Sequence, residues 1–235
     1  MPHRRTAELK RSPAGGVPAK TSPKPDDVLV DGALAFGLPL TPDQVEAFAI
    51  YREEVIRWGA HINLTGLRKD LHIVRAGFLD SLSCLPLIPQ KVERAVDIGS
   101  GAGFPGLPLK IVLPNLLLTI VEASQKKATF LQHIVRRLKL RRVSVVHYRA
   151  ESLASDPSQA ERYELALARS VASVPDQARL VRPFLRPGGL FLAQVGRRSF
   201  PDFERDVGFR LVDEFILPES LGFSDRRVLA FQRTT

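Results

Sequence analysis

The chain has very little of what builds disulfide frameworks, metal centres or membrane spans. Its 235 residues include one cysteine, Cys84, so no internal disulfide can form and no cysteine cluster can bind a metal. The five histidines show no paired ligand spacing, so we expect no metal site. No apolar run approaches the 18 residues that a membrane span needs, and no apolar segment follows the charged N-terminus. These absences predict a cytoplasmic protein that does not enter a membrane.

Acidic residues are also scarce relative to basic ones. The chain carries 34 Lys and Arg against 25 Asp and Glu, which gives a net charge of +9. Such a balance favours an anionic partner, nucleic acid first, although membranes and acidic proteins also attract basic proteins. Residues 1–27 are rich in proline and basic side chains and predict a disordered tail. This tail either tracks phosphates or is a solvated extension without a role.

The most informative stretch is the glycine-rich segment at residues 95–106. An apolar run that ends in Asp97 is followed by a turn in which Gly101, Gly103 and Gly106 satisfy the G-x-G-x-x-G spacing. Glycines there allow a tight turn and a close approach of the backbone to a ligand. The spacing is weak by itself, but a preceding strand and a following helix strengthen it. We therefore expect a nucleotide-type ligand at the end of this strand.

Asp97 decides which ligand is favoured. A dinucleotide would place its pyrophosphate beside this carboxylate, and the like charges would repel each other. S-adenosylmethionine (SAM) has no phosphate, and its methionine end carries an ammonium group that a carboxylate can bind. SAM is therefore favoured over NAD or FAD, and a nicotinamide-dependent oxidoreductase remains the alternative.

A second acid, Glu122, ends the next apolar run. It lies about 20 residues after the glycine loop, the separation at which an acid meets ribose hydroxyls. Asp97 and Glu122 would then hold opposite ends of one adenosyl ligand. The alternative is an acid favoured by a helix start, with Ser124 as the capping residue.

The order of the expected elements is that of an α/β domain. Thr41-Pro42 predicts a helix start, with an apolar face at Val45, Phe48, Tyr51, Val55 and Trp58, and a second helix is expected from Leu71 to Leu85. Strands alternate with helices after that, which predicts helices on both faces of a mostly parallel sheet. The strands are expected at 95–98, 116–121, 143–146, 165–168 and 190–193, with a terminal antiparallel pair near 209–212 and 227–231. We divide the chain into the tail at 1–27, a helical extension at 28–90 and the ligand-binding domain at 91–235.

Two arginines follow strands at the predicted ligand edge of the sheet. Arg149 comes after the third strand and Arg169 after the fourth. There they could bind phosphates or the acceptor edge of a guanine. The alternative is a surface salt bridge, for example to Glu151 or Glu164.

These motifs together resemble the RsmG (GidB) family, bacterial SAM-dependent methyltransferases that modify guanine N7 in the 530 loop of 16S ribosomal RNA. The resemblance covers roughly residues 40 to 195, and the Gly-Phe-Pro-Gly form of the loop is its most specific part. The segments that carry it are 97–109, Asn63-Leu64-Thr65, Phe78-Leu79-Asp80-Ser81-Leu82, 122–127, Arg149-Ala150-Glu151, Arg169-Ser170-Val171-Ala172 and Pro187-Gly188-Gly189.

The resemblance implies a Rossmann-like class I SAM-dependent methyltransferase with an N-terminal helical extension. Its partner would be 16S rRNA or the small ribosomal subunit, and we expect a monomer. Arg149 and Arg169 would act at the active site. SAM would be bound by Asp97, Gly99, Ser100, Gly101, Gly103, Phe104, Glu122, Ala150, Glu151 and Arg169.

Two positions depart from the family pattern. Gly77 stands where a histidine is frequent, and Val195 stands where a lysine is frequent. These losses leave open a catalytically impaired relative that binds SAM or RNA and acts in ribosome assembly or on another RNA. Guanine N7 has a free lone pair and no proton, so we also expect that no residue is essential as an acid or base. Alignment can supply much of the catalysis.

Overall fold

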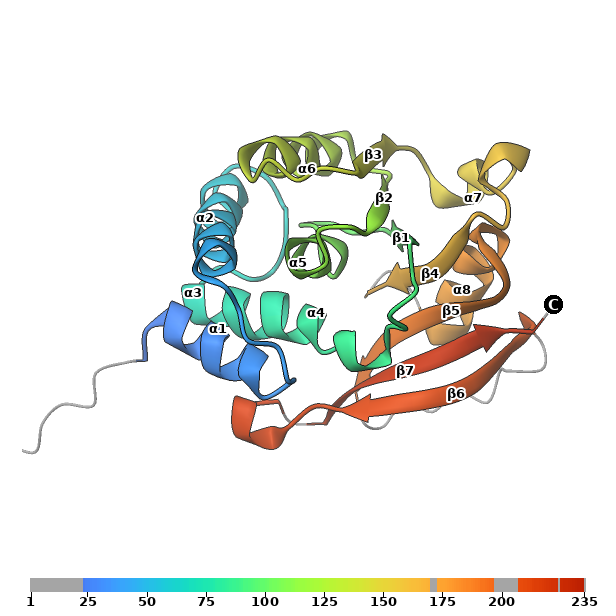
Figure 1. Ribbon diagram of the computed structural model, residues 1–235. Helices are drawn as coiled ribbons and strands as arrows, with labels where there is room; N and C mark the ends of the chain where they lie inside the picture. Colours follow the sequence, from blue (N-terminus) through green and yellow to red (C-terminus); the bar gives the residue numbers. More distant parts are fainter. Residues whose placement is uncertain (1–22, 170–172, 197–206, 224, 235) are drawn as a thin grey trace, which may run out of the picture.

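A computed structural model gives the structure of residues 23–169, 173–196, 207–223 and 225–234. Its centre is one seven-stranded sheet in the order β3-β2-β1-β4-β5-β7-β6 (Figure 1). The first five strands pair in parallel, and β7 pairs antiparallel with both β5 and β6. The predicted fold class and the terminal antiparallel pair are both confirmed. The strands are β1 (Arg94–Ile98), β2 (Leu117–Glu122), β3 (Val143–His147), β4 (Tyr163–Ala168), β5 (Leu185–Gly196), β6 (Phe209–Ile216) and β7 (Arg226–Arg233).

Helices cover both faces of this sheet. The α-helices are α1 (Pro25–Leu34), α2 (Pro42–Gly59), α3 (Asp70–His72), α4 (Asp80–Leu82), α5 (Gly106–Val112), α6 (Gln125–Arg137), α7 (Ala150–Leu153) and α8 (Val174–Val181). A π-helical segment, Ile73–Leu79, joins α3 to α4. Short 3₁₀ turns lie at Leu85–Leu87, Pro157–Gln159, Arg182–Phe184 and Glu219–Leu221. No helix among the described residues is long and apolar enough to cross a membrane.

Alternating side chains of the central strands face two different cores. Ala95 of β1 lies in a core with the N-terminal helices, α5 and α6, whereas Val96 faces a second core with α8. This alternation is what a strand buried on both faces requires. The helices of residues 28–90 contribute to the same core as one face of the sheet, so they are packed directly on it.

The start of α2 follows the predicted chemistry. The Thr41 hydroxyl accepts a hydrogen bond from the Gln44 amide, and the Gln44 side chain accepts one from the Thr41 amide. This reciprocal arrangement satisfies two backbone donors that a helix start otherwise leaves free. Phe48, Tyr51 and Val55 are fully buried on the predicted apolar face.

The first helix begins earlier than the sequence indicated. α1 starts at Pro25, within the segment predicted to be a tail, and residues 1–22 lie outside the described part. Proline suits the first position of a helix, and an acidic first turn complements the helix dipole. Asp26 also forms an ion pair with Arg52 of α2 at 2.5 Å, a contact between distant segments that local composition does not reveal.

The helix predicted from Leu71 to Leu85 exists as three consecutive segments. α3, the π-helical segment and α4 together span 70–82, and Pro86 lies in the 3₁₀ turn beyond them. π-helical turns widen the backbone locally and occur frequently at functional sites. Here the widened segment lies beside the glycine loop, because Gly77 packs against Phe104.

Tyr51 joins the N-terminal helices to the glycine loop. Its hydroxyl donates a 2.5 Å hydrogen bond to the carbonyl of Ala102, and both residues are buried. Burial, assisted by the charge of Asp97, raises the pKa of Tyr51 well above its usual value, so the hydroxyl remains a donor. The contact ties the loop to α2.

Replacing Tyr51 by phenylalanine should therefore destabilise the protein. The change leaves the Ala102 carbonyl buried without a donor, which costs about 1–3 kcal/mol of unfolding free energy. Urea unfolding followed by circular dichroism measures this. The matched control is Tyr163→Phe. In the part of the chain that the structure describes, this hydroxyl bonds to the Gln159 side chain alone, and we expect a change within about 0.5 kcal/mol. Equal effects of the two changes would contradict the role given to Tyr51.

Candidate active site

The glycine loop connects β1 to α5 at the carboxyl end of the central strand. Gly101 and Gly103 have φ angles of +61° and +95°, which side chains rarely adopt. A Cβ at Gly106 would lie 2.6 Å from the Asp97 carboxylate, so close packing requires glycine there too. The backbone conformation and close packing of the loop therefore explain why its sequence has glycine at these three positions.

Asp97 is completely buried beneath this loop. Its Oδ2 accepts hydrogen bonds from the Ser100 hydroxyl at 2.5 Å and the Gly106 amide at 2.9 Å. Burial raises the pKa of Asp97 to about 6, although these hydrogen bonds and the charge of Arg169 oppose the shift. The second oxygen, Oδ1, has no hydrogen-bond partner among the described residues. A buried acceptor without a partner fits the ammonium group of SAM, which would supply both a donor and a positive charge.

Glu122 holds the loop from β2. One carboxylate oxygen accepts the Gly101 amide at 2.9 Å, and the other accepts the Ser124 amide at 2.8 Å. The side chain of Ser124 makes no capping bond to α6, so the helix start is served by Glu122 instead. A carboxylate has about four acceptor positions, so two remain for the hydroxyls of a ribose.

Two cavities lie on either side of Gly99. The first, of about 540 Å³, is lined on one side by Tyr148, Arg149, Ala150 and Glu151, which follow β3. We call it the adenosine-side cavity, because it contains the positions predicted to lie by the adenine. The second, of about 640 Å³, is lined by Leu64, Thr65, Asp80, Gly99, Ser100, Gly101, Ala102, Phe104, Lys127, Arg169 and Arg226, among others. We call it the acceptor-side cavity.

The structure therefore brings most predicted site residues together but separates the two arginines. Arg149 lines the adenosine-side cavity and is exposed, whereas Arg169 lines the acceptor-side cavity. The guanidinium of Arg169 lies 4.9 Å from the centre of the Phe104 ring, within range of a cation–π contact. Ser170 and the two residues after it lie outside the described part.

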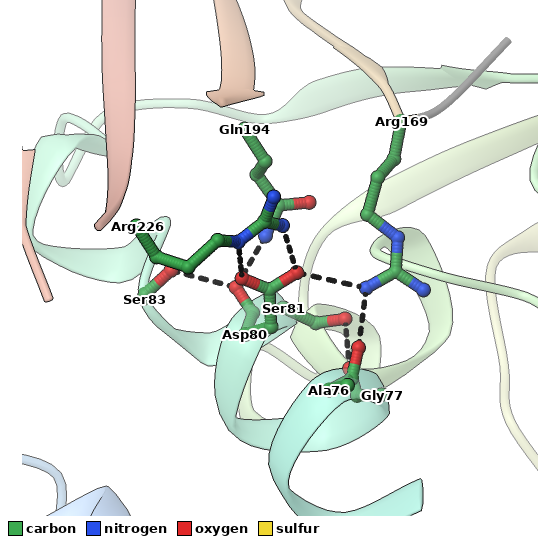
Figure 2. Close-up of polar contacts among 8 residues, drawn as sticks. All are labelled: Ala76, Gly77, Asp80, Ser81, Ser83, Arg169, Gln194 and Arg226. Atoms are coloured by element: carbon green, nitrogen blue, oxygen red, sulfur yellow. Dashed lines mark hydrogen bonds and ion pairs between the residues drawn. The ribbon is translucent and has the colours of Figure 1, made fainter. Parts of the chain in front are cut away.

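Arg169 belongs to an ion-pair network centred on Asp80 (Figure 2). Its Nη1 lies 3.0 Å from Asp80 Oδ2 and donates to the Ala76 carbonyl at 2.8 Å. Arg226 binds both oxygens of the same carboxylate, at 3.0 and 2.6 Å. Gln194 of β5 also donates to the Asp80 backbone carbonyl. The salt bridge considered for Arg169 thus exists, but its partner is Asp80 and neither Glu151 nor Glu164.

Asp80 and Arg226 are functional candidates that sequence reasoning did not assign. Asp80 stood within the motif at 78–82, yet its pairing with residues 89 and 146 positions away has no local signal. Arg226 opens the last strand, where it reads as an ordinary surface residue. Only the sheet order, which puts β7 beside β5, places it at the cavity.

The two departures from the family pattern have packing explanations. A Cβ at Gly77 would lie 2.9 Å from the Phe104 ring, so glycine makes room for that aromatic side chain. Val195 of β5 is 6% exposed and packs in the second core with α8. Neither residue lines the acceptor-side cavity as the structure describes it.

Fold and site together define a class I SAM-dependent methyltransferase. The structure resembles a SAM-dependent methyltransferase from Aquifex aeolicus, with a TM-score of 0.51, 12% identity, and coverage of 66% of this chain and 90% of that one. It also resembles a ribosomal protein L11 methylase from Lactobacillus delbrueckii, with a TM-score of 0.52, 14% identity, and coverage of 67% and 78%. At these identities the likeness concerns the fold.

The sequence comparisons are more specific. The profile of the GidB family, described as rRNA small subunit methyltransferase G, matches residues 44–208. A ribosomal RNA small subunit methyltransferase G from Acetivibrio thermocellus is 36% identical over 214 residues, 88% of this chain and 87% of that protein. Its counterpart from Roseiflexus castenholzii is 46% identical over 170 residues, 72% and 73% of the two chains. The chain belongs to the GidB (RsmG) family, and the resemblance found in the sequence is confirmed.

The buried carboxylate of Asp97 makes SAM affinity dependent on pH. Below a pKa of about 6 the acid becomes neutral and no longer attracts an ammonium group. We expect SAM binding measured by calorimetry to weaken by about tenfold per pH unit below 6 and to level off towards pH 7, where an α-amino group is still mostly protonated. Asp97→Asn should bind at least about tenfold more weakly at pH 7 and show no such dependence. A constant affinity of the native protein from pH 5 to 7 would refute this role.

Asp80 should control the acceptor side without affecting SAM. In Asp80→Asn the two arginines lose a charged acceptor, and we expect a loss of about 1.5–3 kcal/mol in unfolding free energy. RNA methylation should fall as the arginines lose their fixed positions, while SAM affinity stays within about threefold. The control is Asp213→Asn, an exposed position whose carboxylate bonds, among the described residues, to the next amide alone. Loss of SAM binding alone in Asp80→Asn would contradict the division into two sides.

Proposed function

We propose that the chain transfers the methyl group of SAM to N7 of a guanine in the 530 loop of 16S rRNA. Family membership supports small-subunit rRNA as the substrate. The observation that supports guanine N7 is the pairing of Asp80. This acid lines the acceptor-side cavity, and both of its carboxylate oxygens already accept hydrogen bonds from arginines. No other acid lines that cavity as the structure describes it, which suits an atom that is methylated without losing a proton.

The residues around Gly99 would bind the methyl donor. Asp97 Oδ1 would accept the ammonium group, and the free acceptor positions of Glu122 would receive the ribose hydroxyls. Ala150 and Glu151 would lie by the adenine in the adenosine-side cavity. The loop residues Gly99, Ser100, Gly101, Gly103 and Phe104 would line the donor between these two ends.

Catalysis would rest on alignment and on the arginines. SAM, when bound, supplies a methyl group activated by a sulfonium. The lone pair of N7 forms the new bond to carbon as the carbon–sulfur bond breaks, so guanine gains a positive charge and no proton is removed. Arg169 and Arg226 would hold the acceptor edge of guanine or its phosphate, and holding two reactants in register can contribute several kcal/mol. Arg149 would act at the adenosine side, where it lies exposed at the cavity rim.

The remaining expectations follow from this activity. We expect a cytoplasmic monomer that binds 16S rRNA or the small subunit without a metal. The described residues contain no cluster of three metal-binding side chains. Residues 28–90 would support the acceptor side through the helical segment at 70–82, and the part of the tail that precedes α1 would be dispensable for folding. No described contact favours an impaired relative, because Gly77 and Val195 are accounted for by packing.

Methyl transfer to small subunits that lack the modification tests the proposal. We expect label from SAM to appear in 16S rRNA as 7-methylguanosine, identified by mass. Arg169→Ala should lower kcat/KM for RNA about 10- to 100-fold, with SAM affinity within about threefold. Arg186→Ala, which removes an exposed arginine paired with Glu164, serves as the control and should change neither value. Measurable SAM binding without transfer to subunits or free rRNA would refute the proposal.

A further inference from the structure

One continuous segment of this chain carries basic residues and no acidic ones. Residues 123–150, which include α6 and β3, contain eight of the 34 Lys and Arg residues and none of the 25 Asp and Glu residues. The net charge of the whole chain is +9, so this segment accounts for nearly all of it. We call its cations the α6–β3 basic strip: Lys126, Lys127, Arg136, Arg137, Lys139, Arg141, Arg142 and Arg149.

The strip lies on the surface along one edge of the molecule. β3 is the edge strand of the sheet, and α6 packs beside it, as Figure 1 shows. The buried side of α6 is apolar, with Phe130, Leu131 and Ile134 in the core. Its outward side consists of polar and basic residues that are exposed: Gln125, Lys126, Thr129, Gln132, Arg136 and Arg137.

Most cations of the strip have no acidic partner. Among the described residues, only Arg137 forms an ion pair, with Glu54 at 3.9 Å, and Arg142 donates to the Asn115 carbonyl. In the part of the chain that the structure describes, no acidic side chain forms an ion pair with Lys126, Arg136, Lys139 or Arg141. Elsewhere, arginines such as Arg52, Arg169 and Arg226 are paired with acids. The strip therefore presents charge that is available to an outside partner.

One end of the strip is at the active site. Lys127 lines the acceptor-side cavity, and Arg149 lines the adenosine-side cavity. The other end surrounds a separate hollow of about 580 Å³ with Lys139, Arg141 and Arg142. The 13 residues of α6 separate these ends by about 20 Å. A partner seated in the active site could thus continue along the strip over several phosphates.

The composition of the strip favours nucleic acid over a protein or a membrane. Protein interfaces have buried aromatic or aliphatic anchors, and membrane-surface helices present a broad apolar face. Of the described large apolar residues that are strongly exposed, only Tyr148 lies in this segment, and it is at the active-site end. Gln125, Thr129 and Gln132 accompany the cations instead, and such side chains bond to phosphate and sugar oxygens.

We propose that the α6–β3 basic strip binds the sugar–phosphate backbone of the RNA that flanks the methylated guanine. The proposal rests on the function proposed above, and it adds where the RNA lies on the protein. Arg136 and Arg141 contact phosphates outside the active site, so they contribute affinity and orientation without touching the reacting atoms. The strip does not discriminate between RNA sequences, because phosphate contacts position a nucleic acid without specifying its bases.

The test compares two double variants that remove the same charge. Arg136→Ala with Arg141→Ala acts on the strip. The control, Arg162→Ala with Arg210→Ala, removes two exposed arginines elsewhere, one before β4 and one on β6 at the opposite edge of the sheet. Full-length proteins are assayed for SAM binding, for binding to unmodified 16S rRNA between 50 and 200 mM salt (about the range over which phosphate contacts are sensitive), and for methyl transfer.

We expect the strip variant to bind rRNA about 5- to 20-fold more weakly and to flatten the salt dependence of log K by about 1.5–2. KM for RNA should rise accordingly, while kcat at saturating RNA and SAM affinity remain within twofold. The control variant should resemble the native protein. Equal RNA affinities and salt slopes for the two variants would overturn the proposal.

The two proposals can fail separately. If the native protein binds rRNA and the strip variant loses that affinity, but no 7-methylguanosine forms, the strip stands and the proposed reaction fails. If methyl transfer occurs and the strip variant retains native KM and salt slope, the reaction stands and the strip fails. Melting temperatures within about 2 °C of each other show that both variants are folded.

Discussion

The carboxylate of Asp80 is the point on which the acceptor side of the site depends. It lies 3% exposed in the helical segment at 70–82, and it binds Arg169 from the end of β4 and Arg226 from the start of β7. Each arginine is only partly buried, so its guanidinium group is held by Asp80 on one side and remains accessible to solvent on another. A buried acid that lost both partners would be costly, and this constrains the helices, the central sheet and the terminal hairpin to one arrangement. The acceptor-side cavity exists because these three parts meet there.

The proposed donor side depends on a different buried acid. Asp97 has a raised pKa because it is fully buried, and its two hydrogen bonds and the charge of Arg169 offset only part of that effect. Its other oxygen has no hydrogen-bond partner among the described residues. The native state therefore binds a proton more tightly than the unfolded chain does between about pH 4 and 6, and stability without ligand falls as pH rises through that window. A cationic ligand reverses this effect, since it favours the charged form. The charged form of Asp97 therefore lowers the stability of the free protein, and a bound cation would restore that stability.

Local signals explain why the donor side could be predicted from the sequence. The apolar run before Asp97, the glycine spacing and the distance to Glu122 all lie within 30 residues, and each has a direct backbone cause in the structure. The Thr41-Pro42 helix start was predictable for the same reason. The acceptor side was not, because Asp80 and Arg226 are 146 residues apart and meet only through sheet order. The π-helical segment and the fit of Gly77 against Phe104 are likewise products of packing between distant elements.

Positive charge is arranged differently in the acceptor-side cavity and along the α6–β3 basic strip. Within the acceptor-side cavity, Arg169 and Arg226 share one acid, which balances one of their two charges and holds both side chains in defined positions. Such fixed positions suit the alignment of a base edge. Along the α6–β3 basic strip, cations stand mostly without acids, which suits phosphates that demand charge but little exact geometry. A fixed arginine that was also unpaired would bind any phosphate in the cavity, whereas pairing with Asp80 weakens that attraction and leaves geometry to discriminate. Affinity thus comes from outside the cavity, and the selection of one nucleotide comes from inside it.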